Sequence, residues 1–152
     1  MIEDTGGIKS VVDSNADALE ILEDHFHYTG FVRPNLANGI SIQSAAGAWA
    51  AFPTPTQIIA ASDITSIFDI HWLDIADISA ADDYQIQLYT GAALSEVLLD
   101  PSTFSAVAGS LKISAFATGT IRVPANTRIS AALSNKNAAQ RTLALKLKGH
   151  TY

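Results

Sequence analysis

Phe68-Asp69-Ile70-His71-Trp72 carries the strongest strand pattern in the sequence. Phe68, Ile70 and Trp72 alternate with two polar residues. Side chains of a β-strand point alternately to its two faces, so this period of two predicts a strand with one buried face. The three apolar side chains, Trp72 included, are predicted to face the core, and Asp69 and His71 are predicted to share the opposite face.

Similar alternation, or a short apolar run, recurs from residue 47 to the end of the chain. Turn residues separate the runs at intervals of roughly 8–12 residues, which is typical of a sandwich, jelly roll or barrel. No convincing helical pattern lies between them, which argues against a parallel α/β sheet. The fold class predicted is all-β, an antiparallel jelly roll or β-sandwich of about eight strands. The expected strands are 48–52, 56–61, 66–75, 84–89, 94–99, 111–117, 120–123, 129–133 and 143–147.

The first 28 residues have a different pattern. Ser14 followed by Asp17 can open a helix that runs to about Phe26. The apolar stripe of this helix is expected to pack against a partner, either the chain's own domain or another molecule. The residues of this stripe follow heptad spacing and include one polar residue: Ile8, Val12, Asn15, Leu19, Leu22 and Phe26. The organisation predicted is therefore an N-terminal arm (1–28), a connector holding a short strand (29–46) and a β-sandwich domain (47–152).

Composition excludes several classes of protein. The chain has 152 residues, of which 48% are hydrophobic and only 16% are charged, and it contains no cysteine. It is therefore neither a disordered segment nor a disulfide scaffold. The apolar run 45–61 is interrupted by Pro53 and Pro55 and is too short to span a bilayer. The acidic start lacks the pattern of a signal peptide, so we expect a soluble protein made in a cytoplasm, with no membrane partner.

Charge is divided along the chain. All 15 acidic residues lie at or before Asp100, so residues 1–110 carry a net −13 and residues 111–152 carry +7. Either basic late strands lie beside acidic early ones within one sandwich, or copies of the chain, or the chain and a partner, meet acidic side to basic side. The basic third has no signature of nucleic-acid binding, and the net charge of −6 argues against that role.

Candidate chemistry is sparse. Asp69 and His71 resemble a catalytic dyad in form, but no nucleophile elbow accompanies them, and a structural pair at a sheet surface or subunit interface is the better interpretation. His25-Phe26-His27 could chelate a metal on a strand but not within one helix, which is the structure expected there. A trimer could still gather such pairs on its axis into an octahedral site, but an ordinary solvated or capping pair is the better interpretation. We therefore expect no enzyme activity, no cofactor and no metal site.

Exposed aromatic residues could bind sugar. Trp49 and Tyr89 are the open candidates, whereas Trp72 and Tyr84 lie on predicted core faces. Outward strand positions carry mostly Ala, Ser and Thr. Because a free monomer is expected to carry more surface charge, this composition suits faces that other subunits cover.

Several blocks of sequence, in the same order over most of the chain, together resemble a group of small virion proteins of tailed bacteriophages. The chain departs from that pattern after His25-Phe26-His27, where the group continues with charged residues and a tryptophan. The blocks that carry the resemblance are Ile2-Glu3-Asp4-Thr5-Gly6-Gly7-Ile8-Lys9-Ser10, Phe68-Asp69-Ile70-His71, Tyr84-Gln85-Ile86-Gln87-Leu88-Tyr89-Thr90-Gly91, Val123-Pro124-Ala125-Asn126-Thr127-Arg128-Ile129-Ser130 and His150-Thr151-Tyr152.

The resemblance implies a virion structural protein with a jelly-roll domain. The role it favours is a decoration or cement protein on the capsid exterior, made in the host bacterial cytoplasm and working as a homotrimer with an arm that grips the shell. A tail or head-fibre component that binds host-surface glycan is the alternative. The partners implied are the major capsid protein and the chain itself.

Two sets of contact residues follow from these interpretations. The arm would touch capsid or neighbouring subunits through Glu3, Asp4, Ile8, Val12, Leu19 and Leu22. The candidates for a subunit interface in the sandwich are Asp69, His71, Arg128 and Arg141.

Overall fold

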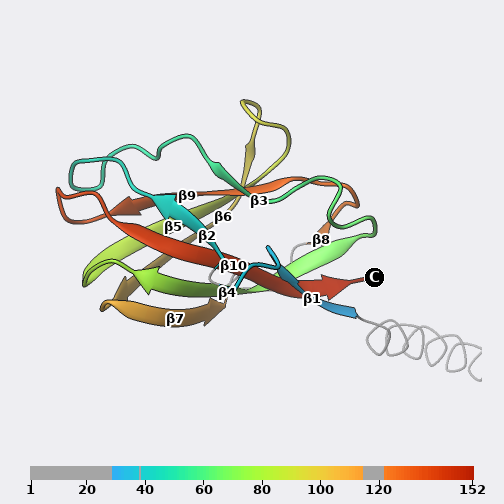
Figure 1. Cartoon of the computed structure of the whole chain (residues 1–152). Coiled ribbons are helices and arrows are strands. Elements are labelled where there is room, and N and C mark those ends of the chain that lie inside the picture. The colour runs from blue at the N-terminus through green and yellow to red at the C-terminus, as the bar shows by residue number, and fades with distance from the viewer. Residues whose placement is uncertain (1–28, 38, 115–121) are drawn as a thin grey trace, which may run out of the picture. The chain divides into compact units, whose positions relative to one another are not determined.

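The computed structural model describes residues 29–37, 39–114 and 122–152 (Figure 1). Over these ranges the chain forms ten strands and no helix, so no described helix is long and apolar enough to cross a membrane. The predicted all-β class is confirmed. Several predictions for the arm lie outside the described residues. They are the helix, the pair His25 and His27, and the contacts Glu3, Asp4, Ile8, Val12, Leu19 and Leu22.

The strands form two antiparallel sheets. One has six strands: β1 (Thr29–Arg33), β2 (Ile40–Gln43), β4 (Phe68–Ile78), β7 (Gly109–Ser114), β8 (Arg122–Val123) and β10 (Thr142–Thr151). The other has four: β3 (Thr56–Ile59), β5 (Asp82–Thr90), β6 (Val97–Ala106) and β9 (Ile129–Asn135).

The order of the strands defines the topology. In the first sheet the neighbours run β2-β10-β4-β7, with β1 also paired to β10 and β8 also paired to β4. In the second they run β3-β9-β5-β6. Along the chain from β2 to β7 and from β9 to β10, successive strands alternate between the two sheets, except for the hairpin β5-β6, and the resulting order is that of the eight-strand jelly roll. The strands β1 and β8 are additions to it.

The core lies between the two layers seen in Figure 1. Its members come from alternate positions of the central strands, as the period of two requires. The hydroxyl of the fully buried Tyr84 donates a hydrogen bond to the carbonyl oxygen of Ala80 at 2.6 Å, so its polar atom is satisfied. The largest fully buried side chains are Tyr84, Phe68, Ile59, Ile70, Leu73, Ile75, Ile86, Leu88, Ile129, Leu133, Leu143 and Leu145.

The sandwich begins earlier than the sequence predicted. Residues 29–46, expected as a connector with one short strand, contain β1 as well as β2, which is the short strand expected, and both pair with β10. Residues 48–52, expected as a short strand, form none. This segment instead crosses the end of the sandwich, where the amide of Trp49 donates a hydrogen bond to the carbonyl of Asn135.

The strand β6 does not end at Asp100-Pro101, as expected, but continues to Ala106. Proline lacks an amide donor and is therefore tolerated in edge strands. The described part of β6 pairs only with β5, so it is an edge strand of its sheet. The register between these strands shifts beside the proline, between Leu88 and Tyr89 of β5.

A second irregularity changes which residues of β4 face the core. On β10, Lys148 is opposite Trp72 and the next residue, Gly149, is opposite Ile70. His71 is therefore the extra residue of a β-bulge, and a bulge reverses the alternation beyond it. Leu73 is buried in consequence, and Trp72, predicted to be in the core, is 48% exposed.

Candidate functional site

The bulge in β4 places two neighbouring side chains on the same side of the sheet. His71 and Trp72 both line a pocket, together with residues of β1 and β10. Bulges are common beside functional sites, where they re-aim a side chain. Here the irregularity directs His71 toward a carboxylate that lies two residues earlier in the same strand.

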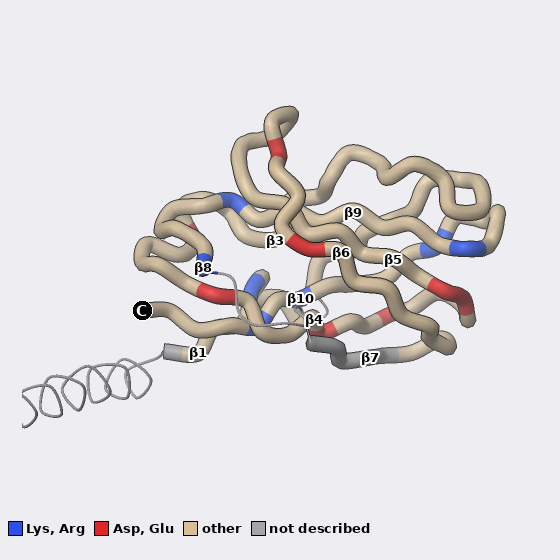
Figure 2. The backbone as a smooth tube through the Cα atoms, turned by 180° about the vertical axis from the view of Figure 1, so that it is seen from behind, with Lys and Arg blue, Asp and Glu red and all other residues tan. Residues whose placement is uncertain are grey.

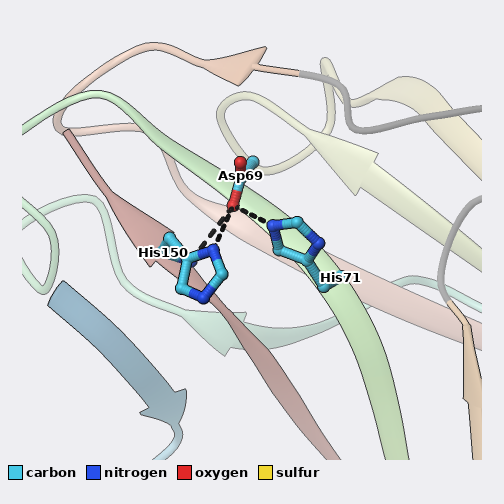
Figure 3. A group of neighbouring side chains, drawn as sticks. All are labelled: Asp69, His71 and His150. Atoms are coloured by element: carbon cyan, nitrogen blue, oxygen red, sulfur yellow. Dashed lines mark hydrogen bonds and ion pairs between the residues drawn. The ribbon is translucent and has the colours of Figure 1, made fainter. Parts of the chain in front are cut away.

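That carboxylate, Asp69, is buried, with a side chain only 1% exposed. Burial of a charge is costly unless partners compensate it. One oxygen, Oδ1, accepts a hydrogen bond from the backbone amide of His150 at 3.0 Å and lies 2.8 Å from Nε2 of His71. Nδ1 of His150 lies 3.9 Å from the same oxygen. Figure 3 shows the two imidazole rings converging on this carboxylate from two adjacent strands.

The two rings are close to each other as well. The centroids of His71 and His150 are 4.5 Å apart and the rings are tilted by 58°. Their side chains are 30% and 41% exposed, so both are partly open to solvent. Nε2 of His71, however, is buried and has no hydrogen-bond partner among the described residues, although it lies 2.8 Å from Oδ1 of Asp69.

A glycine makes this arrangement possible. A Cβ atom added to Gly149 would lie 1.7 Å from the backbone oxygen of Asp69 and 2.8 Å from the ring of Phe31. Only a residue without a side chain lets β10 approach β4 so closely at the bulge. The close approach brings the amide of His150 within hydrogen-bonding distance of Asp69.

The pocket over this cluster has a volume of about 320 Å³. Its lining combines apolar, aromatic and basic groups. Lys148 lines it too, but its ammonium is paired with Asp74 of β4 at 2.9 Å. The complete lining is Gly30, Phe31, Val32, His71, Trp72, Lys148, Gly149 and His150.

The predicted pair Asp69 and His71 is therefore confirmed as a contact, but its setting differs from the prediction. Asp69 was expected on a solvent-facing or interface surface and is instead buried beneath two histidines. Sequence reasoning gave His150 no part in this cluster. No local signal could have placed it there, because its position depends on the pairing of β10 with β4.

Basic residues late in the chain form ion pairs with acidic residues early in the chain. Four late basic residues pair with early acids: Arg128 with Glu96 at 2.9 Å, Lys136 with Asp83 at 2.9 Å, Arg141 with Asp82 at 3.3 Å and Lys148 with Asp74 at 2.9 Å. Figure 2 shows basic and acidic segments mixed over the tube. The prediction of internal pairing is confirmed for these four residues.

The two arginines proposed for a subunit interface are thus tied to their own chain. Arg128 donates hydrogen bonds to Glu96 and to the side chain of Gln57, and it lowers the pKa of Glu96 through that hydrogen bond. Arg141 donates to Asp82. Their role at an interface stays a prediction.

Asp82 shows how the internal network holds a carboxylate. Burial alone would raise the pKa of Asp82, but hydrogen bonds outweigh it. The amide of Asn135, the backbone of Asp83 and the guanidinium of Arg141 are its first donors, so the pKa lies below its ordinary value. This carboxylate is a structural anchor for the turn between β9 and β10.

The small outward residues of β9 are covered by their own chain. All seven residues of the strand are buried, including Ser130, Ala132 and Ser134, which the alternation had placed outside. Their register partners on β5 are Tyr89, Gln87 and Gln85. These longer side chains flank the small ones, so the composition of β9 does not require another subunit to cover it.

The aromatic predictions are confirmed in part. Trp49 is exposed and Tyr84 is buried, as predicted, whereas Trp72 is exposed instead of buried. Tyr89 is half-buried, and burial raises the pKa of its hydroxyl. Trp72 is the exposed aromatic residue that also lines the pocket.

Fold and site together define a jelly-roll domain with a carboxylate–dihistidine pocket on its six-stranded sheet. No protein-family model and no curated protein matches the chain. Two solved structures are similar to it: that of infectious bursal disease virus Gt strain, at 11% sequence identity and a TM-score of 0.37, and that of the Gx strain, at 10% and 0.38. Each match covers 83% of this chain and 33% of the viral chain, so the chain spans about a third of their length.

Proposed function

We propose that this chain is a virion structural protein of a tailed bacteriophage, without enzymatic activity. In this role it decorates the outside of the capsid as a cement protein, assembled as a homotrimer. A subunit that binds only the assembled shell adds its binding free energy to the stability of the shell. Repeated over a lattice, modest contacts give high avidity.

The observation that carries the proposal is the jelly-roll strand order, β2-β10-β4-β7 facing β3-β9-β5-β6. Viral capsid domains and lectins are among the proteins built on this topology. Fold alone does not assign function, so the proposal also draws on the sequence blocks that resemble small phage virion proteins. The blocks at 84–91 and 123–130 lie in and before the strands β5 and β9, which pair with each other.

An apolar patch on the four-stranded sheet also supports a subunit contact. We define the β6 patch as Leu94, Val97 and Leu98, at the turn from β5 into β6 and the start of β6. Their exposed fractions are 92%, 65% and 48%. Large apolar side chains clustered on a surface mark interaction sites more often than isolated ones do. Leu94 also has a positive φ of 68°, a backbone conformation that a leucine rarely adopts.

The arm supplies the second contact in this proposal. Residues 1–28 would bind the major capsid protein, and the β6 patch would meet a second copy of the chain. Four late basic residues already pair with early acids within the sandwich, so we expect this contact to be apolar rather than a meeting of opposite charges.

The experiment uses capsids stripped of this protein and the purified full chain. We expect the full chain to co-sediment with capsids in saturable fashion and the chain lacking residues 1–28 to stay in solution while retaining its β-sheet circular dichroism. Leu94→Asp combined with Val97→Asp should shift a trimer to monomers, whereas Leu36→Asp, at another exposed leucine, should not. Capsid binding by the truncated chain would refute the role of the arm, and an unchanged monomer for all variants would refute the trimer.

The second candidate is a tail or head-fibre component that binds host-surface glycan. The observation that favours it is the exposed Trp72 on the pocket of about 320 Å³. Aromatic rings are common platforms for sugar, and lectins also use the jelly-roll topology. Saturable binding to host cells that Trp72→Ala abolishes, with no binding to stripped capsids, would favour this function over decoration.

A further inference from the structure

We propose that Asp69, His71 and His150 form a binding site for one divalent transition-metal ion of the zinc class. One ligand atom from each residue lies within 4.8 Å of the other two. The set of two imidazoles and one carboxylate is a common one for zinc and for related first-row metals. This site is independent of the virion role and adds to it a metal that joins two strands.

The distances suit such an ion. A tetrahedral zinc with ligands at about 2.0–2.2 Å keeps its ligand atoms roughly 3.3 Å apart. Oδ1 of Asp69 lies 2.8 Å from Nε2 of His71 and 3.9 Å from Nδ1 of His150, which brackets that spacing. Shifts of the two imidazole nitrogens by a few tenths of an ångström to about 1 Å would bring all three ligand atoms to this spacing, and both rings are partly exposed.

The positions of the three side chains suit a single cation. Asp69 offers a buried carboxylate oxygen to such an ion. The centroids of the two imidazole rings are 4.5 Å apart, so one ion can reach both rings. Nε2 of His71 is buried without a hydrogen-bond partner among the described residues, and a metal ion would engage it.

The backbone around the cluster positions both histidines beside Asp69. His71 reaches Asp69 because it is the extra residue of the bulge, and His150 reaches it because Gly149 lets β10 come close. The backbone amide of His150 holds Oδ1 of Asp69 in place, as outer hydrogen bonds do for metal-binding carboxylates. Lys148, the cation that lines the same pocket, is paired with Asp74.

Three protein ligands leave a coordination position for a water molecule, as in open zinc sites. His71 and His150 line the same pocket as Trp72, so we expect that position to be open to the pocket. The ion would link the end of β10 to β4. Because it would bind the folded sandwich and not the unfolded chain, it would stabilise the folded state. Metal binding would therefore be visible as a rise in Tm.

The test uses the full chain without an affinity tag and with His25→Gln and His27→Gln, because those two histidines could bind zinc on their own. We expect one zinc per chain by isothermal titration calorimetry. At a free zinc concentration 100 times the dissociation constant, Tm should rise by roughly 5–10 °C. Magnesium, which prefers oxygen ligands, should leave Tm unchanged.

His71→Gln and His150→Gln, each added separately, should remove the zinc-dependent rise in Tm and lower zinc affinity at least tenfold. His150, with 41% of its side chain exposed, is the variant least able to disturb folding. A crystal of the full chain soaked in zinc should show an anomalous peak between the three residues. Three results would overturn the proposal. Zinc binding could persist in both the His71→Gln and the His150→Gln proteins. Zinc could bind the unsubstituted chain but not the chain with His25→Gln and His27→Gln, or it could bind neither.

Discussion

Gly149→Ala tests the close approach of β10 to β4, on which both the bulge and the carboxylate cluster depend. The added Cβ would lie 1.7 Å from the backbone oxygen of Asp69, whereas Cβ contacts under 3.0 Å essentially never occur. The two strands would therefore have to separate by roughly 1.3 Å or more. That separation also weakens the hydrogen bond from the amide of His150 to the carboxylate of Asp69.

The magnitude follows from these two effects. Overpacking costs about 1–3 kcal/mol, and loss of a hydrogen bond to a charged group adds about 1.5–3 kcal/mol. We therefore expect Gly149→Ala to lower the free energy of unfolding by about 3–5 kcal/mol. For a domain of this size each kcal/mol corresponds to about 2–4 °C, so Tm should fall by about 6–20 °C.

The assay is urea unfolding followed by tryptophan fluorescence and far-ultraviolet circular dichroism. Gly30→Ala on β1 is the matched control, because the nearest atoms to its Cβ would be 3.9 Å away. We expect that control to lie within about 1 kcal/mol of the unsubstituted chain. A Gly149→Ala protein within about 0.5 kcal/mol of the unsubstituted chain, with the same dependence on urea, would show that the strands do not approach as described.

Three further outcomes are expected. Leu133→Ala should lower the free energy of unfolding by about 2–5 kcal/mol in urea titrations, because the side chain is fully buried between the sheets and its removal leaves a cavity. Arg128→Ala should lower the free energy of unfolding more than Lys136→Ala does in the same titrations. Arg128 donates a hydrogen bond to the partly buried Glu96, whereas Lys136 forms an exposed ion pair; equal losses for the two would contradict this ranking. Stability measured against pH should fall on acidification, because the pKa of Asp82 is lower in the folded state: its contribution is complete above the unfolded pKa of about 3.9 and disappears as pH falls through the folded value. Asp82→Asn should flatten this part of the profile, and a profile identical to that of the unsubstituted chain would count against the network around Asn135.

Regular alternation made most strands predictable from sequence. The patterns around Ile86, Leu133 and Leu145 correspond to strands whose inward positions are buried, because each strand lies in a sheet with one face on the core. A period of two is a local property, so it can be recognised before the partners of a strand are known. The class of fold was predictable for that reason.

Features that depend on strand pairing were not predictable in the same way. Trp72 is exposed because β4 carries one residue more than β10 at His71, and nothing within β4 marks that position. The strand β6 continues through Pro101 because it lies at a sheet edge, a position known only once the strand order is known. Asp69 and His71 could be paired by spacing, but His150 joins them from 79 residues further along the chain.

Imaging of the virion by electron cryomicroscopy would show where this protein lies in the particle. We expect a two-sheet jelly roll on the capsid exterior, present as three copies around a symmetry axis, with the segment before β1 against the major capsid protein. Absence of this chain from the particle, or its presence only at the tail, would contradict a decoration role.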